Sequence, residues 1–421
     1  MPAAPSLLIV PYRSKTGKLY SQIPTSGAGD FTVTRDTTAR RFNSAGLIAS
    51  VASGIPRLDY YTSGGTAGCP ALLVEPAGTN LVQRSEEFSN AYWSKGSGAN
   101  VVADDAVAPD GTTTADRINL VSGSTISRVE RTAGLAYTAS TDYTLSFFLK
   151  NIALTSGQTF AIRLEGTGGF DLVGTVTLFS NTISVALTGT AGTGFVSGSQ
   201  KSTVENYGNG WYRYSISLRT GTTAGNAAVY LITNVDANRS FYAWGAQLET
   251  GSVATSYIPT TAGTGSRSAD VVSVSGAVSG SIGQTEGVLY IECESNDGLD
   301  DVIFVNRSVS NGIALYKNAS NAYIGRIFHS SASILFTSAN NITGMVKIAI
   351  AYKSGDSTMY LNGSRVGTLN TGAITFNAAL NSLVIEKSAG FISGIKSNRI
   401  RAVALYNTRL TNAELATLTT L

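Results

Sequence analysis

The sequence is short of charge and cysteine, and each shortage excludes a class of protein. Charged residues make up 14% of the 421 residues and the net charge is +3, against roughly 25% charged residues in an average soluble protein. No cluster of Lys and Arg forms the basic footprint of a nucleic-acid-binding protein. The two cysteines, Cys69 and Cys293, are far apart and form neither a disulfide framework nor a CxxC zinc motif. We therefore expect two free thiols.

Long apolar runs and helical periodicity are also missing. No run reaches the ~20 apolar residues that cross a bilayer. Residues 7–10 are too short, and lack the basic flank, for a signal peptide. Only a short segment near the C-terminus has the spacing of a helix. We expect no insertion into a membrane.

The chain does contain apolar residues in alternation, separated by turns rich in glycine. Hydrophobic residues are 43% of the sequence and glycine contributes 45 residues, a composition typical of short strands joined by turns. Residues 241–249 alternate with period two, which places Trp244 on one face of a half-buried strand with Tyr242 and Leu248. We expect Trp244 to be buried in a domain core.

The pattern divides the chain into three parts. Residues 1–80 have short candidate strands and little sustained alternation, so we expect an irregular N-terminal region that orders by packing on something larger. Residues 81–265 contain about eight to ten alternating segments between Gly and Asn turns, which predicts a jelly-roll sandwich. Residues 266–421 predict a second sandwich. Residues 260–268 between the two sandwiches have the composition of a linker, so the second sandwich should fold alone.

Local patterns in the last part are specific. Asn362-Gly363 predicts a two-residue hairpin turn, because both central residues of that turn need positive φ. Thr411 and Glu414 have the spacing of a capping box and predict the start of a short helix. The expected fold is therefore all-β: two β-sandwich domains, of jelly-roll and concanavalin-A-like type, behind an irregular N-terminal region.

The sequence offers no catalytic constellation. His329 is the single histidine and no GxSxG motif accompanies it, so a Ser-His-Asp triad is disfavoured. Acids available to a glycosidase include Glu165, Asp171, Glu249 and Glu292. Glycoside hydrolysis needs two carboxylates at a defined separation, and these four are no better candidates than other acids. We name no catalytic residue and expect a protein that is not an enzyme and binds no cofactor.

One acidic loop is a candidate calcium site. Asp297, Asp300 and Asp301 lie in a stretch that also contains Gly298, and carboxylate oxygens are ligands that Ca²⁺ prefers. The spacing is not that of an EF-hand, and a solvated acidic turn explains the same residues. The presence of a metal stays open on the sequence.

Aromatic residues provide the candidate sugar-binding surfaces, because rings cover the apolar face of a sugar while amides satisfy its hydroxyls. The candidates are Tyr92 and Trp93 in the middle part and Tyr316, Tyr323 and Tyr406 in the last part. For each of them, packing in a core is the favoured explanation. Trp211 and Trp244 lie inside alternating segments and are expected in the core.

Several longer motifs carry a resemblance to a known family. They are PRLDYYTSGGTAGCPALLVEPAGTNLVQRSEEFSNAYWSK, APDGTTTADRI, NGWYRYSISL and FYAWGAQLETGSVATSYIPT. Over residues 31–259 the sequence resembles bacteriophage fibre and appendage proteins, which carry a jelly roll like that of carbohydrate-binding modules. The C-terminal stretches VKIAIAYKSGDSTMYLNGSRVG and IRAVALYNTRLTNAEL are similar to concanavalin-A-like and laminin-G-like lectin domains.

The resemblance implies a bacteriophage virion protein, a head fibre or tail fibre, of the kind found in phages of gut Bacteroidales. It implies a homotrimer that contacts capsid or tail proteins, with weak multivalent adhesion to bacterial surface glycans or mucus. Because residues 1–80 lack a self-sufficient core, we expect this segment to attach the protein to the virion. Two alternatives stay open: a tail spike depolymerase that degrades glycans, and a capsid decoration protein without a ligand. The sequence distinguishes neither head from tail nor one glycan from another.

Overall fold

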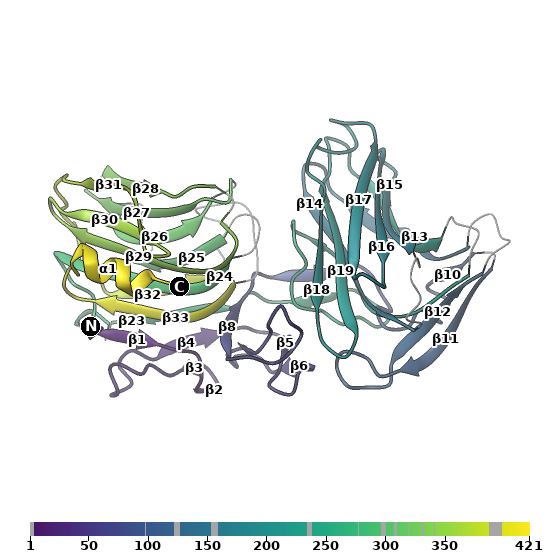
Figure 1. Cartoon of the computed structure of the whole chain (residues 1–421), viewed down its shortest axis with the longest axis horizontal. Helices are drawn as coiled ribbons and strands as arrows, with labels where there is room; N and C mark the ends of the chain where they lie inside the picture. Colours follow the sequence, from purple (N-terminus) through teal and green to yellow (C-terminus); the bar gives the residue numbers. More distant parts are fainter. Residues whose placement is uncertain are drawn as a thin grey trace.

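The computed structural model contains two β-sandwiches that lie side by side along the long axis of the molecule (Figure 1). It describes residues 4–96, 98–121, 127–152, 159–233, 238–276, 278–295, 300–306, 310–318, 320–330, 332–340, 342–386 and 398–421. Neighbouring strands in both sandwiches run antiparallel. The only helix within these ranges is α1, Asn412–Thr419. The predicted all-β class is confirmed.

The first sandwich is a jelly roll of two six-stranded sheets. One sheet has the order β10 (Ser94–Lys95), β13 (Ser127–Tyr137), β20 (Gly225–Thr233), β15 (Thr159–Gly166), β16 (Phe170–Thr177) and β17 (Thr182–Gly189). The other has the order β11 (Ala99–Ala106), β12 (Ala115–Leu120), β21 (Arg239–Thr250), β14 (Asp142–Asn151), β19 (Trp211–Arg219) and β18 (Lys201–Asn206). Four of the alternating segments of this part of the sequence, at residues 143–150, 160–165, 211–218 and 228–233, fall within β14, β15, β19 and β20.

Alternation decides which face of each jelly-roll strand enters the core. Along β14 the side chains of Tyr143, Leu145, Phe147 and Leu149 are buried in one apolar cluster between the two sheets. Burying such a side chain stabilises the fold by about 1.5–3 kcal/mol. The same strands therefore leave a second face, pointing away from this core, for other contacts.

Strand β21 departs from simple alternation at Gly245. This residue has φ +65°, and the register against β14 shifts by one residue around it, as in a bulge with glycine in the left-handed region. Leu248 consequently faces the jelly-roll core, while Trp244 and Tyr242 belong to a cluster on the opposite face. Trp244 is fully buried, as predicted. The prediction that it shares a face with Leu248 is wrong.

The second sandwich takes strands from both ends of the chain. Its eight-stranded sheet has the order β31 (Ser364–Asn370), β30 (Ser357–Leu361), β29 (Gly344–Lys353), β24 (Glu286–Ser295), β33 (Asn398–Tyr406), β8 (Ala71–Val74) and β7 (Leu58–Asp59), with β1 (Leu7–Ile9) also beside β33. The nine-stranded sheet has the order β2 (Ser14–Lys15), β3 (Lys18–Leu19), β4 (Phe31–Thr34), β23 (Val271–Ser275), β32 (Ser382–Glu386), β25 (Asp300–Val305), β26 (Asn311–Lys317), β27 (Tyr323–His329) and β28 (Ala332–Thr337).

The expected separate N-terminal region at residues 1–80 is therefore wrong. Strand β1 pairs with β33, β4 with β23, and β8 with β33. Leu7, Leu19 and Phe31 are completely buried in the core of the second sandwich. This part of the chain showed no core of its own because its partner strands lie at the other end of the sequence. Ser6, for example, bonds to Leu405, 399 residues away.

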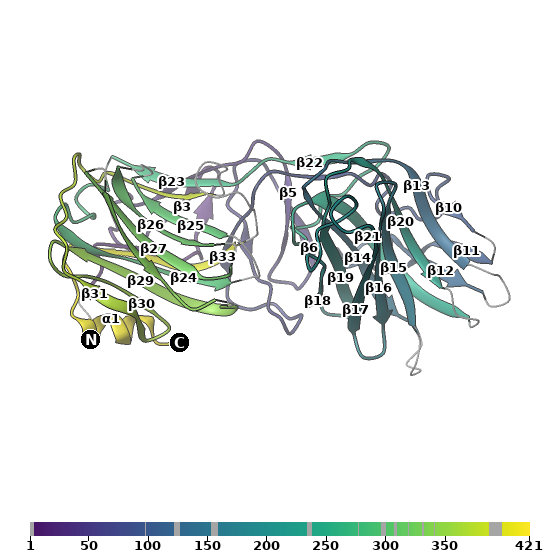
Figure 2. The ribbon, with the colours of Figure 1, turned by 90° about the horizontal axis from the view of Figure 1, so that it is seen from above.

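Residues 260–268 are likewise not a free linker. Strand β22 (Gly265–Arg267) pairs with β9 (Gly78–Asn80), so the outgoing and returning chain cross between the sandwiches as a two-stranded ribbon. Figure 2 shows β22 above the gap between the two domains. A boundary at residue 265 would therefore cut through a paired strand.

The local predictions in the last part are confirmed. Asn362 and Gly363 both have positive φ and join β30 to β31. Thr411 is the N-cap of α1, and both hydrogen bonds of the capping box with Glu414 form. Neither Cys69 nor Cys293 forms a disulfide with a described residue, as expected. No helix in the described part of the chain has the length and hydropathy needed to cross a membrane.

A short hairpin fills the space between the sandwiches. It consists of β5 (Ala39–Phe42) and β6 (Ile48–Val51). Phe42 and Ile48 of this hairpin pack with Trp211 and Trp244 on the outer face of the jelly-roll sheet. The face that the jelly-roll core leaves free is therefore covered by the chain's own N-terminal third.

Residues 270–421 expressed alone should not fold, because the fragment lacks β1, β4, β7 and β8. Each missing buried side chain removes about 1.5–3 kcal/mol, and several such losses exceed the 5–15 kcal/mol of a typical domain. Circular dichroism and urea denaturation should show no cooperative transition, in contrast to the full chain. A cooperative, full-length-like melt of the fragment would contradict the shared sandwich.

Trp244→Ala should destabilise the protein by roughly 3–5 kcal/mol, as expected when a large buried side chain is truncated. The Trp244 ring lies 4.5 Å from that of Tyr257, and its indole nitrogen donates to the Thr114 hydroxyl at 3.1 Å. Urea denaturation of the full chain measures the loss. Trp244→Phe, which keeps a ring in the cluster, is the control and should cost less; equal losses would show that ring packing is not what matters.

Candidate functional site

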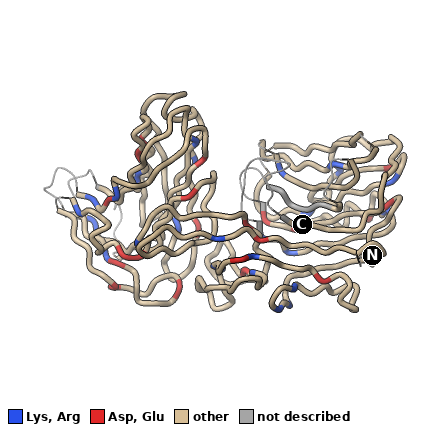
Figure 3. The backbone as a smooth tube through the Cα atoms, turned by 180° about the vertical axis from the view of Figure 1, so that it is seen from behind, with Lys and Arg blue, Asp and Glu red and all other residues tan. Residues whose placement is uncertain are grey.

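Buried charges gather where the chain crosses between the sandwiches. We call this group the junction network: Arg35, Arg57, Glu75, Arg267 and Asp270, each at most 2% exposed. Arg57 donates to Glu75 at 2.6 Å and also pairs with Asp270. Arg35 reaches Asp270 at 2.8 Å and Arg267 reaches Glu75 at 3.1 Å. Segments of both signs of charge meet between the two domains (Figure 3).

Each member of the network stands at the end of a strand. Arg35 follows β4, Arg57 precedes β7, Glu75 follows β8 and Asp270 precedes β23, while Arg267 ends β22. Burial alone would raise the pKa of Glu75, but Arg267 and Arg57 together hold that pKa well below its usual range. The Glu75 carboxylate therefore stays ionised at neutral pH, and its ion pairs with Arg57 and Arg267 tie the crossing ribbon to the second sandwich.

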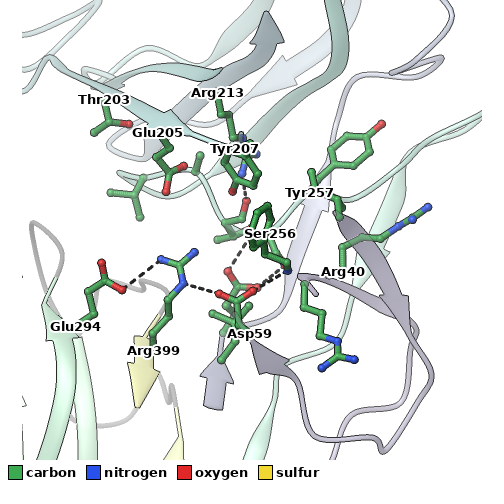
Figure 4. A pocket seen from close by; sticks show the side chains of 18 of the residues that line it. Arg40, Asp59, Thr203, Glu205, Tyr207, Arg213, Ser256, Tyr257, Glu294 and Arg399 are labelled. Atoms are coloured by element: carbon green, nitrogen blue, oxygen red, sulfur yellow. Dashed lines mark hydrogen bonds and ion pairs between the residues drawn. The ribbon is translucent and has the colours of Figure 1, made fainter. Parts of the chain in front are cut away.

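A cavity of about 370 Å³ opens beside this network (Figure 4). The jelly roll contributes Glu205 from β18, Arg213 from β19 and Tyr207 from the turn between them. The second sandwich contributes Asp59 from β7 and Arg399 from β33. The cavity thus exists only where both domains meet.

Arg213 and Arg399, two of the four arginines that line the cavity, are held in place by neighbouring groups. Arg399 donates from Nε to Asp59 at 2.6 Å, and its guanidinium carbon lies 4.4 Å from the centre of the Tyr61 ring. Arg213 donates to the Ser146 hydroxyl at 3.0 Å and lies 5.1 Å from the Phe148 ring centre. Arg399 also pairs with Glu294 at 3.9 Å. Because each guanidinium carries five N–H donors, Arg399 keeps donors that these two acids do not use.

Some polar groups that line the cavity have no partner among the described residues, and Glu205 and Tyr207 carry two of them. The Glu205 carboxylate and the Tyr207 hydroxyl form no hydrogen bond and no ion pair with any residue that the structure describes. Burial raises the pKa of Glu205, although Arg399 and Arg213 act in the opposite direction. Burial and the nearby Glu205 carboxylate also raise the pKa of Tyr207. Unpaired ionisable groups at a hollow are a mark of functional sites.

This arrangement suits a ligand rich in hydroxyl groups. A sugar hydroxyl accepts a hydrogen bond from a guanidinium and donates one to a carboxylate. Arg399 and Glu205 enter the cavity from opposite domains, as Figure 4 shows. The volume falls within the ~300–1,000 Å³ of small-molecule sites.

The aromatic residues singled out in the sequence do not form a site. Trp93, Tyr323 and Tyr406 are buried, at 1%, 1% and 6% exposure. Tyr92 is partly exposed under the Arg131 guanidinium at 4.3 Å, and Tyr316 is a partly exposed residue of β26. None of them lines the cavity. Trp211 and Trp244 are buried as predicted, but between the jelly roll and the β5–β6 hairpin.

The acids and the histidine named from the sequence are also dispersed. Glu165 and Asp171 face each other across β15 and β16 around Arg163. Glu249 is buried and accepts hydrogen bonds from Gln247 and Thr255. Glu292 accepts one from Tyr290 on the same strand. His329 ends β27, opposite Asn311 and Ala332.

Much of the candidate calcium loop lies outside the residues that the structure describes. Asp297 lies outside the described residues, and Asp300 and Asp301 begin β25. Within the described ranges, no three acidic, histidine or cysteine side chains gather as a metal site would require.

Sequence analysis missed Glu205, Tyr207 and Arg399. One pattern points toward the first two: in β19, Arg213 shares the outer face with Trp211, and its register partner in β18 is Glu205. A charge on the same strand face as a buried Trp indicates that another domain covers that face. No comparable pattern in the sequence points to Arg399.

Glu205→Gln should stabilise the folded protein near pH 7. The folded-state pKa of Glu205 is raised above its ordinary value of 4.5, so ionisation costs stability as the pH rises through the folded pKa. The gain from glutamine should therefore be largest at neutral pH and vanish below about pH 4.

Thermal melts across pH 3–8 measure this difference. Glu87→Gln is the control, because Glu87 sits in an exposed pair with Arg84 and such pairs contribute about 0–1 kcal/mol. A Glu205→Gln variant that is less stable than the native protein at pH 7 would show that Glu205 has a stabilising partner.

No protein-family model matches this sequence, and a search of curated proteins found no match either. Solved structures show distant structural similarity to β-sandwich domains. A botulinum neurotoxin type C structure has 12% identity and a TM-score of 0.29, over 36% of this chain and 39% of that one.

Two further structures are similar at the same level. The CBM40 domain of a Ruminococcus gnavus sialidase has 13% identity and a TM-score of 0.27, over 32% of this chain and 84% of that one. A SAP-like pentraxin from Limulus polyphemus has 13% identity and a TM-score of 0.24, over 31% and 68%. The chain thus spans less than half of the neurotoxin chain, and the resemblance is one of β-sandwich layout alone.

Proposed function

We propose that this protein is a non-enzymatic glycan-binding protein whose ligand site is the junction cavity. The observation that carries the proposal is the unpartnered carboxylate of Glu205, which shares the cavity with the spare donors of Arg399. Retaining a raised-pKa carboxylate without a partner costs stability, and natural proteins keep such costs mainly where function requires them. Hydroxyl groups of a saccharide would satisfy both side chains at once.

Glycan hydrolysis is the competing function, because the cavity holds several carboxylates and one of them has a raised pKa. A glycosidase needs a second carboxylate that is free to act as base or nucleophile. The oxygens of Asp59 are occupied by Arg399 and by the backbone N–H of Phe42. Those of Glu75 accept from Arg57 and Ser256, and Glu294 pairs with Arg399 at 3.9 Å. Incubating the protein with bacterial capsule and looking for shortened chains separates hydrolysis from binding.

The finer proposal is that the protein is a bacteriophage fibre or appendage, present as several copies in a virion. It is supported by the motifs of residues 56–95 and 241–260 and by the pairing of two sandwiches. Several weak sites on one fibre raise avidity without new contacts. Since β1–β4 belong to the second sandwich, attachment would use the surface of a folded domain and not a separate N-terminal segment. Antibody labelling of virions tests this location.

Removing either unpartnered group should weaken glycan binding. Glu205→Gln removes a charged acceptor, and hydrogen bonds to charged groups contribute about 1.5–3 kcal/mol, which corresponds to roughly tenfold or more in affinity. Tyr207→Phe removes one hydroxyl and should have a smaller effect. A glycan array identifies ligands, and calorimetry on the full chain measures the affinities.

The exposed Glu87→Gln variant is the control and should bind as the native protein does. Unchanged binding by both cavity variants would place the glycan elsewhere on the protein. An array without any bound glycan would overturn the proposed function and favour a ligand-free decoration protein.

A further inference from the structure

The junction holds a second hollow, an open groove of about 470 Å³. Three loops form it: the tip of the β5–β6 hairpin, residues 64–67, and the turn between β18 and β19. The same turn supplies Tyr207 to the charged cavity, but the groove is lined by its neighbours Asn206 and Gly208. The groove is therefore a separate hollow at the same junction.

Glycine allows the loops of the groove to touch. A Cβ on Gly65 would lie 2.3 Å from Oδ1 of Asn206, and a Cβ on Gly208 would lie 2.4 Å from the carbonyl oxygen of Gly65. Both glycines also have positive φ, which other residues adopt only with strain. The Asn206 amide then donates to the Gly64 carbonyl at 3.1 Å and accepts from the N–H of Gly208 at 2.9 Å. These contacts hold residues 64–65 against the turn at residues 206–208, so the base of the groove has a defined shape although loops form it.

The chemistry of the groove differs from that of the cavity. None of the described residues lining it is Asp, Glu, Lys, Arg or His. Ser44, Asn209 and Tyr212 bring a hydroxyl, an amide and a phenol, and their side chains form no hydrogen bond with the described residues. Amides and hydroxyls both donate and accept, and a Tyr ring presents an apolar face beside its hydroxyl.

We propose that this groove is a second binding site, for an uncharged saccharide unit. The inference rests on the proposed glycan-binding function and adds a site whose recognition is neutral. An ionic ligand would find no counter-charge here, whereas neutral hydroxyls match the three free groups and the exposed backbone of the loops. Two unlike sites at one junction would let the protein hold a glycan that carries both charged and neutral units.

Asn209 and Tyr212 allow sharp variants. Asn209 has φ +51°, so Asn209→Gly removes the amide at a position where glycine is unstrained. Tyr212→Phe removes only the hydroxyl. The matched control is Asn181→Gly, because Asn181 also has φ +51° but lies in the turn between β16 and β17, away from the groove.

The experiment uses saturation-transfer NMR on the full chain with neutral disaccharides: lactose, maltose, cellobiose and N,N′-diacetylchitobiose. At least one of them should bind, and Asn209→Gly and Tyr212→Phe should each weaken it about three- to tenfold, as expected for one lost hydrogen bond. Asn181→Gly and Glu205→Gln should leave it unchanged. Affinity should also stay constant between about 0.05 and 0.5 M NaCl, because no charge takes part. Thermal melts verify that each variant is folded.

Two outcomes would contradict saccharide binding in the groove and leave the proposed function intact. In the first, Glu205→Gln abolishes disaccharide binding while Asn209→Gly does not, which places the sugar in the cavity. In the second, no neutral disaccharide binds at about 50 mM although the array finds glycans that depend on Glu205. Array binding that does not depend on Glu205 or Tyr207, with groove binding intact, would instead overturn the cavity as the ligand site.

Discussion

The buried ion pairs of the junction network are the constraint on which the remaining structure depends. Arg57 is completely buried between Glu75 and Asp270. Removing such charges from water costs several kcal/mol per ion, and only well-placed partners offset that cost. Because the partners stand at the ends of second-sandwich strands and in β22, the cost is offset in only one arrangement of these segments. The network therefore ties the crossing ribbon to the second sandwich.

A fixed junction explains why the hollows lie where they do. The outer face of the β21–β14–β19 sheet, with Trp211 and Trp244, is covered by the β5–β6 hairpin and is not free for ligands. The cavity and the groove are the places where this cover does not close against β18 and its turn. The shape of ligand sites at such a boundary would depend on the relative position of both domains. A change in the network would therefore alter the cavity and the groove together.

The sequence predicted those features that depend on neighbouring residues. Alternation located β14 and β19, Asn362-Gly363 located a hairpin, and Thr411 with Glu414 located the helix. It did not predict features that depend on distant partners. The bulge at Gly245 reverses the faces of one strand, β1 pairs with a strand near the C-terminus, and Arg57 meets Asp270 across 213 residues. Glu205 was missed for the same reason, since its surroundings come from Arg399 of the other domain.

Among the acids of the junction, Glu205, which is only partly buried, is the exception that bears on function. Glu75, Asp270 and Asp59 each pair with an arginine, and Glu249 accepts hydrogen bonds from Gln247 and Thr255. Arg399 and Arg213 lie near Glu205, so guanidinium groups that could pair with this fifth carboxylate are present. Packing does not require the carboxylate to stay unpartnered. Its hydrogen-bonding capacity is therefore left open for a group that arrives from solvent, and the volume beside it is large enough to receive one.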